Sequence, residues 1–364
     1  MVRKIKIVVS DLHMGTGYAD SPNPREDFDL DERFAEMLEY YTSGVYASIP
    51  VELILDGDIF DLLKVPVNGR FPEEISDDIS MNKLGECMGG HPVVMDALKK
   101  FLQGDKRRIA YIPGNHDMDF YFVSVQHLFC AALTTNKTDP RVRFILDGDR
   151  YVLPGGVHIM HGHQYEPIHS YNDDEVMLTK GLAKPILNLP WGSFYVLNVI
   201  CPLKEQKPFL DHVRPFYPFF MFGLLTDFRF AMRVVGRSIY YFLKTRFFTI
   251  FNRRTYFKKY MKLLSEDLGV MHNLERHAER TLKTSFGARI VVMGHTHQPM
   301  VRSFGPGKVY LNTGTWTRMV NLSLGTMSSQ MCASYALIEY ENDVPRATLF
   351  EWKGVQRPYE KINM

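Results

Sequence analysis

The chain has 364 residues, of which 45% are hydrophobic and 23% charged, and its formal net charge is +2. This mixture is that of a globular protein with a large core, so it excludes a disordered or fibrous chain. The four cysteines lie far apart without a C-x-x-C pair, which excludes a disulfide framework. The first apolar run is too short for a secretory signal peptide, and we therefore expect a cytoplasmic protein.

Strand and helix signals alternate along the first 165 residues. Short apolar runs predict strands, and apolar residues spaced three and four apart predict helices. We expect helices at 31–41 and 93–102 and strands at 5–9, 51–55, 108–112, 142–146, 151–153 and 157–160. This alternation predicts an α/β domain with one largely parallel inner sheet, which the last three short strands extend.

Strand signals return near the end of the chain, at 288–293, 309–311, 335–340 and 347–352. Between about 170 and 286 they disappear, and the pattern becomes helical and aromatic. We therefore expect one α/β domain built from 1–169 and 287–364, interrupted by a helical, basic and aromatic insertion at 170–286. The uncharged stretch 185–203 contains internal prolines and a glycine, so it is a poor candidate for a membrane-spanning helix.

Five short polar motifs each follow a predicted strand, where the loops of α/β sheets hold ligands. They are Asp11-Leu12-His13, Gly57-Asp58-Ile59-Phe60-Asp61, Gly114-Asn115-His116-Asp117, His161-Gly162-His163 and Gly294-His295-Thr296-His297. Carboxylate oxygens with imidazole nitrogens suit divalent Mn, Fe, Zn or Co. Alternate residues of an extended segment point to one side, so Asp11 with His13, and His295 with His297, are expected to chelate in pairs. The glycines let the backbone approach a crowded centre.

One such motif alone is weak, because a lone histidine is more often a core or surface residue than a ligand. Together the motifs supply seven metal-capable side chains with no Lys or Arg beside them to balance the charge. Burying these groups together is unfavourable unless a cation holds them. The sequence therefore predicts a metal site.

The order D-x-H, G-D-x-x-D, G-N-H-D, H and G-H-x-H resembles the calcineurin-like metallophosphoesterase superfamily over residues 5–165 and 287–316. The resemblance implies an α/β/β/α sandwich with two metals at the strand ends. It implies that the first metal is held by Asp11, His13, Asp58 and His297. Asp58 would bridge to a second metal, completed by Asn115, His161 and His295. The family usually relies on the first histidine of the fourth motif, which leaves His163 unassigned.

The implied cofactors are two divalent ions, with Mn preferred and Fe, Zn or Co as alternatives. Two metals about 3.5–4 Å apart can clamp phosphoryl oxygens and generate a hydroxide for in-line attack. His116 is then expected to act as a general acid on the leaving oxygen. By resemblance Asp61 orients His116, although an ordinary loop aspartate is the alternative. The turn Asn312–Trp316 also resembles the family's closing turn beside the metals.

The insertion concentrates positive charge. Residues 228–265 contain ten basic and eleven aromatic residues and no Asp or Glu, and Arg229, Arg233 and Arg237 recur every four residues. A basic, aromatic, amphipathic helix is typical of a membrane interface, so the 229–262 stretch predicts peripheral contact with anionic lipid. Three alternatives stay open: binding to nucleic-acid phosphates, pairing with the acidic remainder of the chain, and an ordinary helical cap.

Within the superfamily, residues 57–63 and 294–299 are most similar to the UDP-2,3-diacylglucosamine pyrophosphatases of lipid A biosynthesis. That branch cleaves a lipid-linked sugar nucleotide beneath a helical lid at the membrane surface. It usually has Arg in place of His116, and H-G-D in place of His161-Gly162-His163. We expect a two-metal hydrolase of a phosphate or pyrophosphate ester, lipid-linked in the leading hypothesis. The alternatives are a nuclease or phosphodiesterase of the same superfamily and a non-catalytic membrane-recruited scaffold. No obligate protein partner is evident.

Overall fold

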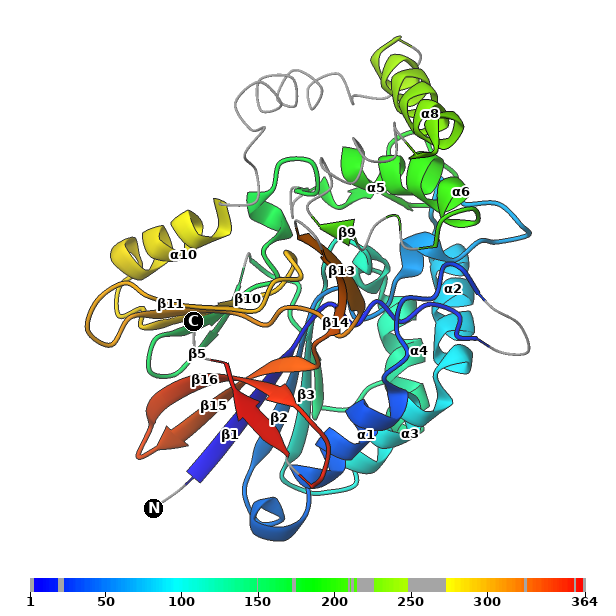
Figure 1. The fold of residues 1–364 in the computed structure, drawn as a ribbon. Coiled ribbons are helices and arrows are strands. Elements are labelled where there is room, and N and C mark those ends of the chain that lie inside the picture. Colours follow the sequence, from blue (N-terminus) through cyan, green and yellow to red (C-terminus); the bar gives the residue numbers. More distant parts are fainter. Residues whose placement is uncertain are drawn as a thin grey trace.

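The computed structural model describes residues 3–18, 23–148, 150–171, 175–208, 210, 213–214, 226–247, 273–323, 326–356 and 358–362. Two sheets pack face to face, with helices α1 to α4 on one side and α10 on the other (Figure 1). The chain therefore folds as the four-layered α/β/β/α sandwich that the family resemblance implies.

The first sheet has seven strands in the order β17-β16-β15-β1-β2-β3-β4. Its strands are β1 (Arg3–Val9), β2 (Val51–Asp56), β3 (Arg107–Ile112), β4 (Val142–Phe144), β15 (Ser334–Glu341), β16 (Val344–Trp352) and β17 (Tyr359–Lys361). Strands β1 to β4 run parallel, and β15 joins β1 antiparallel. All six residues of β2 are buried, as a strand covered on both faces requires.

The second sheet has the order β11-β12-β10-β6-β5. Its strands are β5 (Tyr151–Leu153), β6 (Val157–Ile159), β10 (Ile290–Met293), β11 (Met300–Ser303) and β12 (Val309–Asn312). The expectation that β5 and β6 extend the first sheet is wrong, because both belong to the second. An apolar pattern reports that a strand is buried but not which strand it pairs with.

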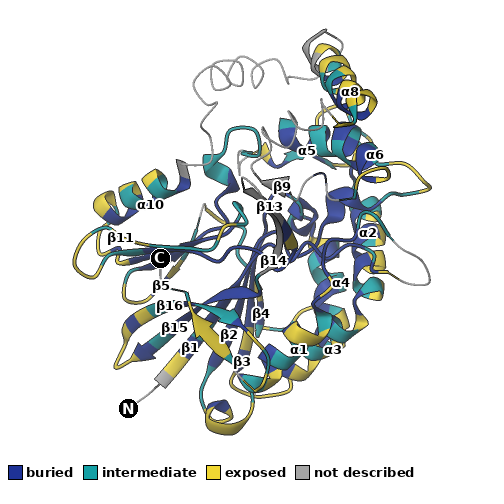
Figure 2. Cartoon of the chain, in the orientation of Figure 1, coloured by how far each residue is buried: buried dark blue, intermediate teal, exposed yellow. Residues whose placement is uncertain are grey.

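Three apolar clusters hold the layers together. One fills the space between the sheets, one lies between the first sheet and its helices, and one lies beneath α10 (Figure 2). The helices are α1 (Asp31–Tyr40), α2 (Asp77–Gly90), α3 (Pro92–Phe101), α4 (Val123–Thr134) and α10 (Asn273–Thr284). The spacing of Phe34, Met37 and Leu38 predicts α1, and all three are buried. Short 3₁₀ turns are η1 (Gly44–Tyr46), η2 (Leu62–Lys64), η3 (Met118–Tyr121) and η4 (His163–Tyr165).

The described part of the 170–286 segment is mainly helical. It contains α5 (Trp191–Tyr195), a π-helical turn η6 (Val196–Ile200), α6 (Cys201–Lys204) and α8 (Phe228–Phe247). The expectation that strands disappear here is wrong, because three two-residue strands occur, too short to leave a pattern: β7 (Met177–Leu178), β8 (Ile186–Leu187) and β9 (Val213–Arg214). Strand β9 pairs with β13 (Arg318–Ser323), which pairs with β14 (Thr326–Met331).

Helix α10 also lies in this segment, yet it packs on the second sheet and supplies the outer layer of the sandwich. The division of the chain into a sandwich domain and an insertion stays a prediction. Among the described residues, no helix has the length and apolar character needed to cross a membrane.

Candidate metal centre

The five polar motifs meet at one edge of the sandwich, at the carboxyl ends of β1, β2, β3, β6 and β10. Backbone hydrogen bonds join the loops to one another. The amide of Asp11 donates to the carbonyl of Gly57 at 3.1 Å, and the amide of Gly294 donates to the carbonyl of His161 at 2.9 Å. Loops far apart in the sequence are thus fixed side by side because parallel strands end at a common edge.

The first group of ligand-type atoms contains Asp11, His13 and His297. Nε2 of His297 lies 3.3 Å from Oδ1 of Asp11, and Nε2 of His13 lies 3.0 Å from Nε2 of His297. Donor atoms that share one ion at about 2.1 Å lie about 3–3.5 Å apart. The spacing of this group therefore fits a divalent cation.

The second group contains Asp58, His161 and His295. Nε2 of His161 lies 3.2 Å from Oδ2 of Asp58. Asp58 also belongs to a group with His13 and His116, so it stands between the two sets, where a bridging carboxylate would. Oδ1 of Asn115 and Nδ1 of His295 are buried and make no hydrogen bond to the described residues. Buried polar atoms without partners fit a cation ligand set.

Two of the histidines are held in the tautomer that metal binding needs. Nδ1 of His161 donates to the carbonyl of Asp56 at 2.7 Å, and Nδ1 of His13 faces Oδ2 of Asp61 at 3.2 Å. In a neutral ring with the proton on Nδ1, Nε2 keeps the lone pair and faces the ligand groups. Metal-binding histidines are typically oriented in this way. The assignment of each residue as a ligand stays a prediction.

The backbone at the site is strained. Five candidate ligands have left-handed φ angles: Asp11 at 54°, His13 at 52°, Asp58 at 52°, His295 at 69° and His297 at 60°. Each such residue costs of order 1–3 kcal/mol and persists where its surroundings fix it, most often at functional sites. The expectation that these ligands chelate from extended segments is therefore wrong, because tight turns, not strand alternation, bring each pair together.

Three glycines allow the backbone of the loops to lie close to the candidate ligands. A Cβ on Gly114 would lie 2.2 Å from Oδ1 of Asp58, and one on Gly294 would lie 2.4 Å from Oδ2 of Asp11. A Cβ on Gly57 would lie 2.5 Å from the ring of His161. These distances are far inside van der Waals contact, so the glycines let the loops approach the candidate ligands as the sequence predicts.

Electrostatics keep the candidate carboxylate ligands ionised. Burial by itself raises the pKa of Asp58, but the nearby His161 and His116 outweigh it and hold that pKa well below its ordinary value. Asp11 has a lowered pKa for the same reason, with burial opposed by His161 and His297. Metal ligands must be deprotonated, so the carboxylates are ready to bind a cation.

His116 and Asp61 form a buried pair beside these groups. Nδ1 of His116 donates to Oδ1 of Asp61 at 2.8 Å, and the His116 amide donates to Oδ1 of Asp58 at 2.8 Å. Burial lowers the pKa of His116, but Asp61 and Asp58 raise it to about 8. Asp61 also contacts His13 and, at 2.8 Å, Nζ of Lys64. The role of Asp61 as the carboxylate that orients His116 stays a prediction.

Two further residues that the sequence did not single out lie at the site. Oε2 of Glu166 contacts Nε2 of His295 and lies 2.9 Å from Nδ1 of His169, so the three form another cluster of ligand-type atoms. Neither Glu166 nor His169 belongs to a motif or follows a strand, so no sequence signal marks them. His163 stacks on Tyr171 with ring centroids 4.7 Å apart and lies outside the ligand groups.

Other polar residues hold the loops in place. Asp117, the last residue of its motif, accepts hydrogen bonds from the Tyr111 hydroxyl at 2.6 Å and from the Gly114 amide at 2.5 Å. In the turn predicted to close the site, Thr315 donates to the carbonyl of Asp11 at 2.7 Å. Asp117 and Thr315 therefore buttress the site through the backbone.

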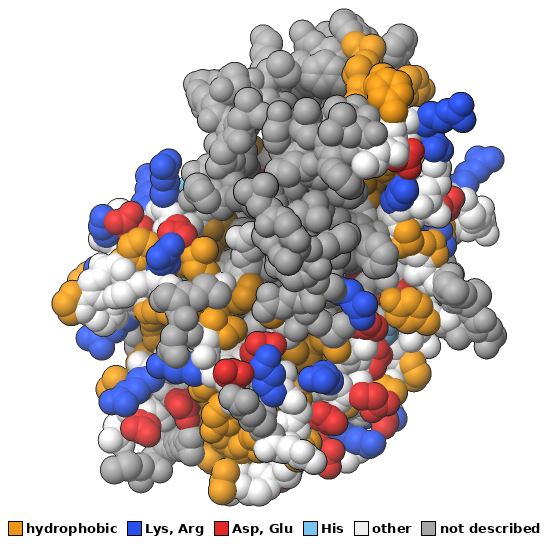
Figure 3. Space-filling model, viewed as in Figure 1, with side chains coloured by type: hydrophobic (Ala, Val, Ile, Leu, Met, Phe, Trp, Pro, Cys, Tyr) orange, Lys and Arg blue, Asp and Glu red, His pale blue; other side chains and the backbone are white. Residues whose placement is uncertain are grey.

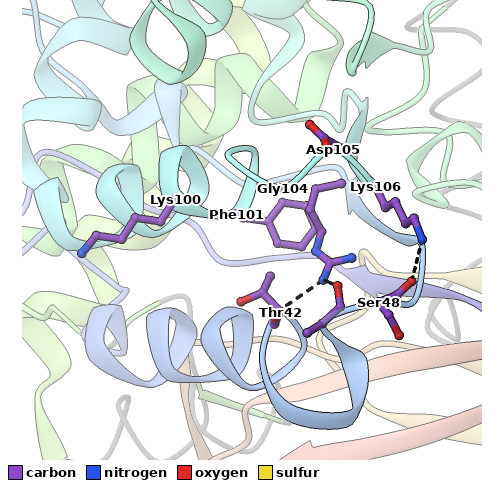
Figure 4. Close-up of a pocket in the computed structure, with 9 residues that line it drawn as sticks. Thr42, Ser48, Lys100, Phe101, Gly104, Asp105 and Lys106 are labelled. Atoms are coloured by element: carbon purple, nitrogen blue, oxygen red, sulfur yellow. Dashed lines mark hydrogen bonds between the residues drawn. The ribbon is translucent and has the colours of Figure 1, made fainter.

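A cavity of about 430 Å³ lies away from this site. It lies at the amino ends of β2 and β3 (Figure 4), and its cations are engaged elsewhere. Lys106 donates to the carbonyl of Ser48, and Arg107 donates to the carbonyls of Ile49 and Tyr46. A smaller cavity of about 50 Å³ is lined by His161, His163 and their neighbours, beside the candidate metal groups.

Comparison with known proteins gives no family assignment. No protein-family model matches the chain, and no curated protein matches it. Vps29 from Entamoeba histolytica, complexed with zinc, is 11% identical over 99% of this chain and 98% of that one, with a TM-score of 0.31. Vps29 from Cryptosporidium parvum is 12% identical over 100% of this chain and 97% of that one, with a TM-score of 0.33. A dimetal phosphatase from Danio rerio is 11% identical over 99% of this chain and 98% of that one, with a TM-score of 0.36. Likenesses this weak assign no function, which has to come from the side chains themselves.

Proposed function

We propose that the protein is a metal-dependent hydrolase of phosphate or pyrophosphate esters. The observation that carries the proposal is the pair of neighbouring ligand groups, with Oδ2 of Asp58 3.2 Å from Nε2 of His161 and 3.9 Å from Nε2 of His13. The buried His116–Asp61 pair lies beside them. Asp11, His13, Asp58 and His297 would hold one divalent cation. Asp58, Asn115, His161 and His295 would hold a second.

Two bound cations would polarise the phosphoryl oxygens and acidify a water molecule for in-line attack. Within the chain, Oδ1 of Asp61 accepts a hydrogen bond from Nδ1 of His116, which fixes the ring so that Nε2 of the protonated imidazole presents the other proton. His116 would deliver that proton to the departing oxygen as a general acid. Asp61 and Asp58 raise the pKa of His116 above its ordinary value, against the effect of burial, and so favour the protonated ring.

The surface of α8 supports a lipid-linked substrate. Phe228, Met232, Ile239 and Leu243 are exposed on one face of this helix, with exposed fractions of 61%, 46%, 53% and 43%. The neighbouring face carries Arg229, Arg233 and Arg237, all exposed. Figure 3 shows hydrophobic side chains at the surface over α8, with basic side chains nearby. The remaining basic residues of the predicted stretch, from 248 to 262, lie outside the described residues.

We therefore propose that α8 contacts an anionic membrane and that the substrate is a lipid-linked ester of the UDP-diacylglucosamine type. Each basic residue near anionic lipid contributes about 1 kcal/mol, so replacing all three arginines with glutamine should weaken vesicle binding by about a hundredfold. Co-sedimentation with phosphatidylglycerol vesicles measures this. The exposed Lys99→Gln/Lys100→Gln double variant of α3 is the control. Equal binding by all three proteins would make the insertion a plain cap.

Two alternatives make different predictions. A nuclease of the same chemistry would cleave DNA or RNA, with binding that weakens steeply as salt rises. A scaffold would bind vesicles and hydrolyse nothing. A scaffold has no need of a buried acid beside a shared carboxylate, and this argues against it.

The test is hydrolysis of a generic aryl phosphodiester and of UDP-2,3-diacylglucosamine by protein freed of metal and reloaded with Mn, Zn, Fe or Co. Turnover that depends on added metal and is lost in Asp58→Asn supports the proposal. The exposed Asp96→Asn variant of α3 should retain activity. Metal-independent turnover, or none on any ester, would overturn it.

A further inference from the structure

A chain of buried charges runs from the 170–286 segment to the His116–Asp61 pair. It starts at Lys204, the last residue of α6, whose side chain is fully buried. Nζ of Lys204 lies 2.6 Å and 2.9 Å from the two carboxylate oxygens of Asp27. Asp27 in turn contacts Nζ of Lys64 at 2.5 Å.

Lys64 completes the connection. Its Nζ lies 2.8 Å from Oδ2 of Asp61, whose other oxygen accepts the hydrogen bond from His116. The side chains of Lys204, Asp27, Lys64 and Asp61 are all at most 5% exposed. Positive and negative side chains therefore alternate in this series of contacts, which ends at the imidazole of His116.

Such an arrangement is strongly coupled, because water does not screen it. Removing one member of a buried ion pair leaves an uncompensated charge, which its neighbours must then balance. Lys64 already contacts both Asp27 and Asp61, and without Lys204 the attraction of Asp27 for Lys64 increases. Lys64 would then move toward Asp27, and Oδ2 of Asp61 would lose its contact with Lys64 and keep the one with His13.

We propose that Lys204 is a positioning residue for the His116–Asp61 pair, acting through Asp27 and Lys64. The 170–286 segment is then part of the machinery that presents the proton to the leaving oxygen. This inference rests on the proposed function, because the role of His116 is defined there.

The test compares two esters in the metal-loaded enzyme. General acid catalysis matters most for a poor leaving group, so Lys204→Met should lower kcat on an alkyl phosphodiester by about tenfold or more, and on an aryl ester with a good leaving group by less than about threefold. Glu205→Gln is the matched control. Glu205 follows Lys204 and pairs at 3.2 Å with Arg25, but it is not part of the buried chain. Its ratio of the two rates should stay at the wild-type value.

A second variant isolates the electrostatic path and covers failure of the first to fold. Asp27→Asn/Lys204→Met removes both charges, so Asp27 no longer draws Lys64 away from Asp61. We expect this double variant to recover the wild-type ratio to within about threefold, as a neutralised pair should. A double variant that folds and still loses the alkyl ester selectively would overturn the proposal.

Thermal unfolding of the metal-free protein gives a readout that needs no turnover. The shifts in Tm caused by Lys204→Met and Asp61→Asn should miss additivity by roughly 2 °C or more, whereas those of Glu205→Gln and Asp61→Asn should add. An active wild type with an unchanged rate ratio in Lys204→Met overturns this inference alone. A wild type without metal-dependent turnover overturns the proposed function, and additive shifts in Tm would then overturn the link between Lys204 and Asp61 as well.

Discussion

His91 should make the stability of the protein depend on pH. This buried histidine directly precedes α3, with Nδ1 2.8 Å from Oδ1 of Asp31 and Nε2 3.4 Å from Oε2 of Glu26. Burial lowers its pKa, but the two carboxylates outweigh burial and raise it from 6.5 to about 9. Glu26 also accepts hydrogen bonds from the amides of Gly15 and Gly17, which follow the candidate ligand His13.

Since the folded state has the higher pKa, it binds more protons than the unfolded state, and stability falls as pH rises. The contribution is fully present below pH 6.5 and is lost as the pH approaches about 9. A shift of this size corresponds to about 3 kcal/mol. Urea unfolding of the metal-free wild type and of His91→Gln at pH 6, 7.5 and 9 measures it, with His127→Gln as control.

The difference in unfolding free energy between wild type and His91→Gln should shrink by about 3 kcal/mol across that range. A difference that stays constant with pH would refute the reasoning, because it would mean that His91 does not gain its charge from Asp31 and Glu26.

Other predictions concern the site itself. Gly114→Ala places a Cβ 2.2 Å from Oδ1 of Asp58, so metal affinity should fall at least about tenfold by calorimetry. The control is Gly85→Ala in α2, where the added Cβ meets open space, and it should stabilise the protein by up to about 1 kcal/mol. Equal metal affinity in Gly114→Ala and Gly85→Ala would contradict the prediction. His116→Gln should lower kcat on an alkyl phosphodiester by about a hundredfold or more and leave the bound metal content unchanged. A proportional loss of metal would instead make His116 a ligand.

The parts of the fold that sequence predicts are those set by local patterns. Strands β1, β2 and β3 are short apolar runs, and the polar motifs follow them directly, so their convergence at one edge could be expected. The apolar pattern does not predict helix α2, because half of the buried residues of this helix are polar. Ser80 and Lys83 are buried beside Leu84 and Cys87. The same limit applies to β9, which is only two residues long.

Contacts between loops that lie far apart in the sequence could not be predicted from it. Glu166 meets His295 across 129 positions, and Lys204 meets Asp27 across 177. No periodicity links such residues, because their contact depends on how the whole chain packs. The left-handed backbone of Asp11 and His295 was likewise unpredictable, since residue type biases φ only weakly for residues other than glycine.

The most direct test of the central claim is a metal titration of the metal-free protein, followed by calorimetry and by turnover of an aryl phosphodiester in the same samples. The proposal predicts two bound divalent ions per chain, with turnover that appears as they bind. Asp58→Asn, which alters the carboxylate proposed to bridge the two ions, should weaken both sites and abolish turnover. Binding of two ions and full activity in Asp58→Asn would contradict the claim that these residues form one shared metal centre.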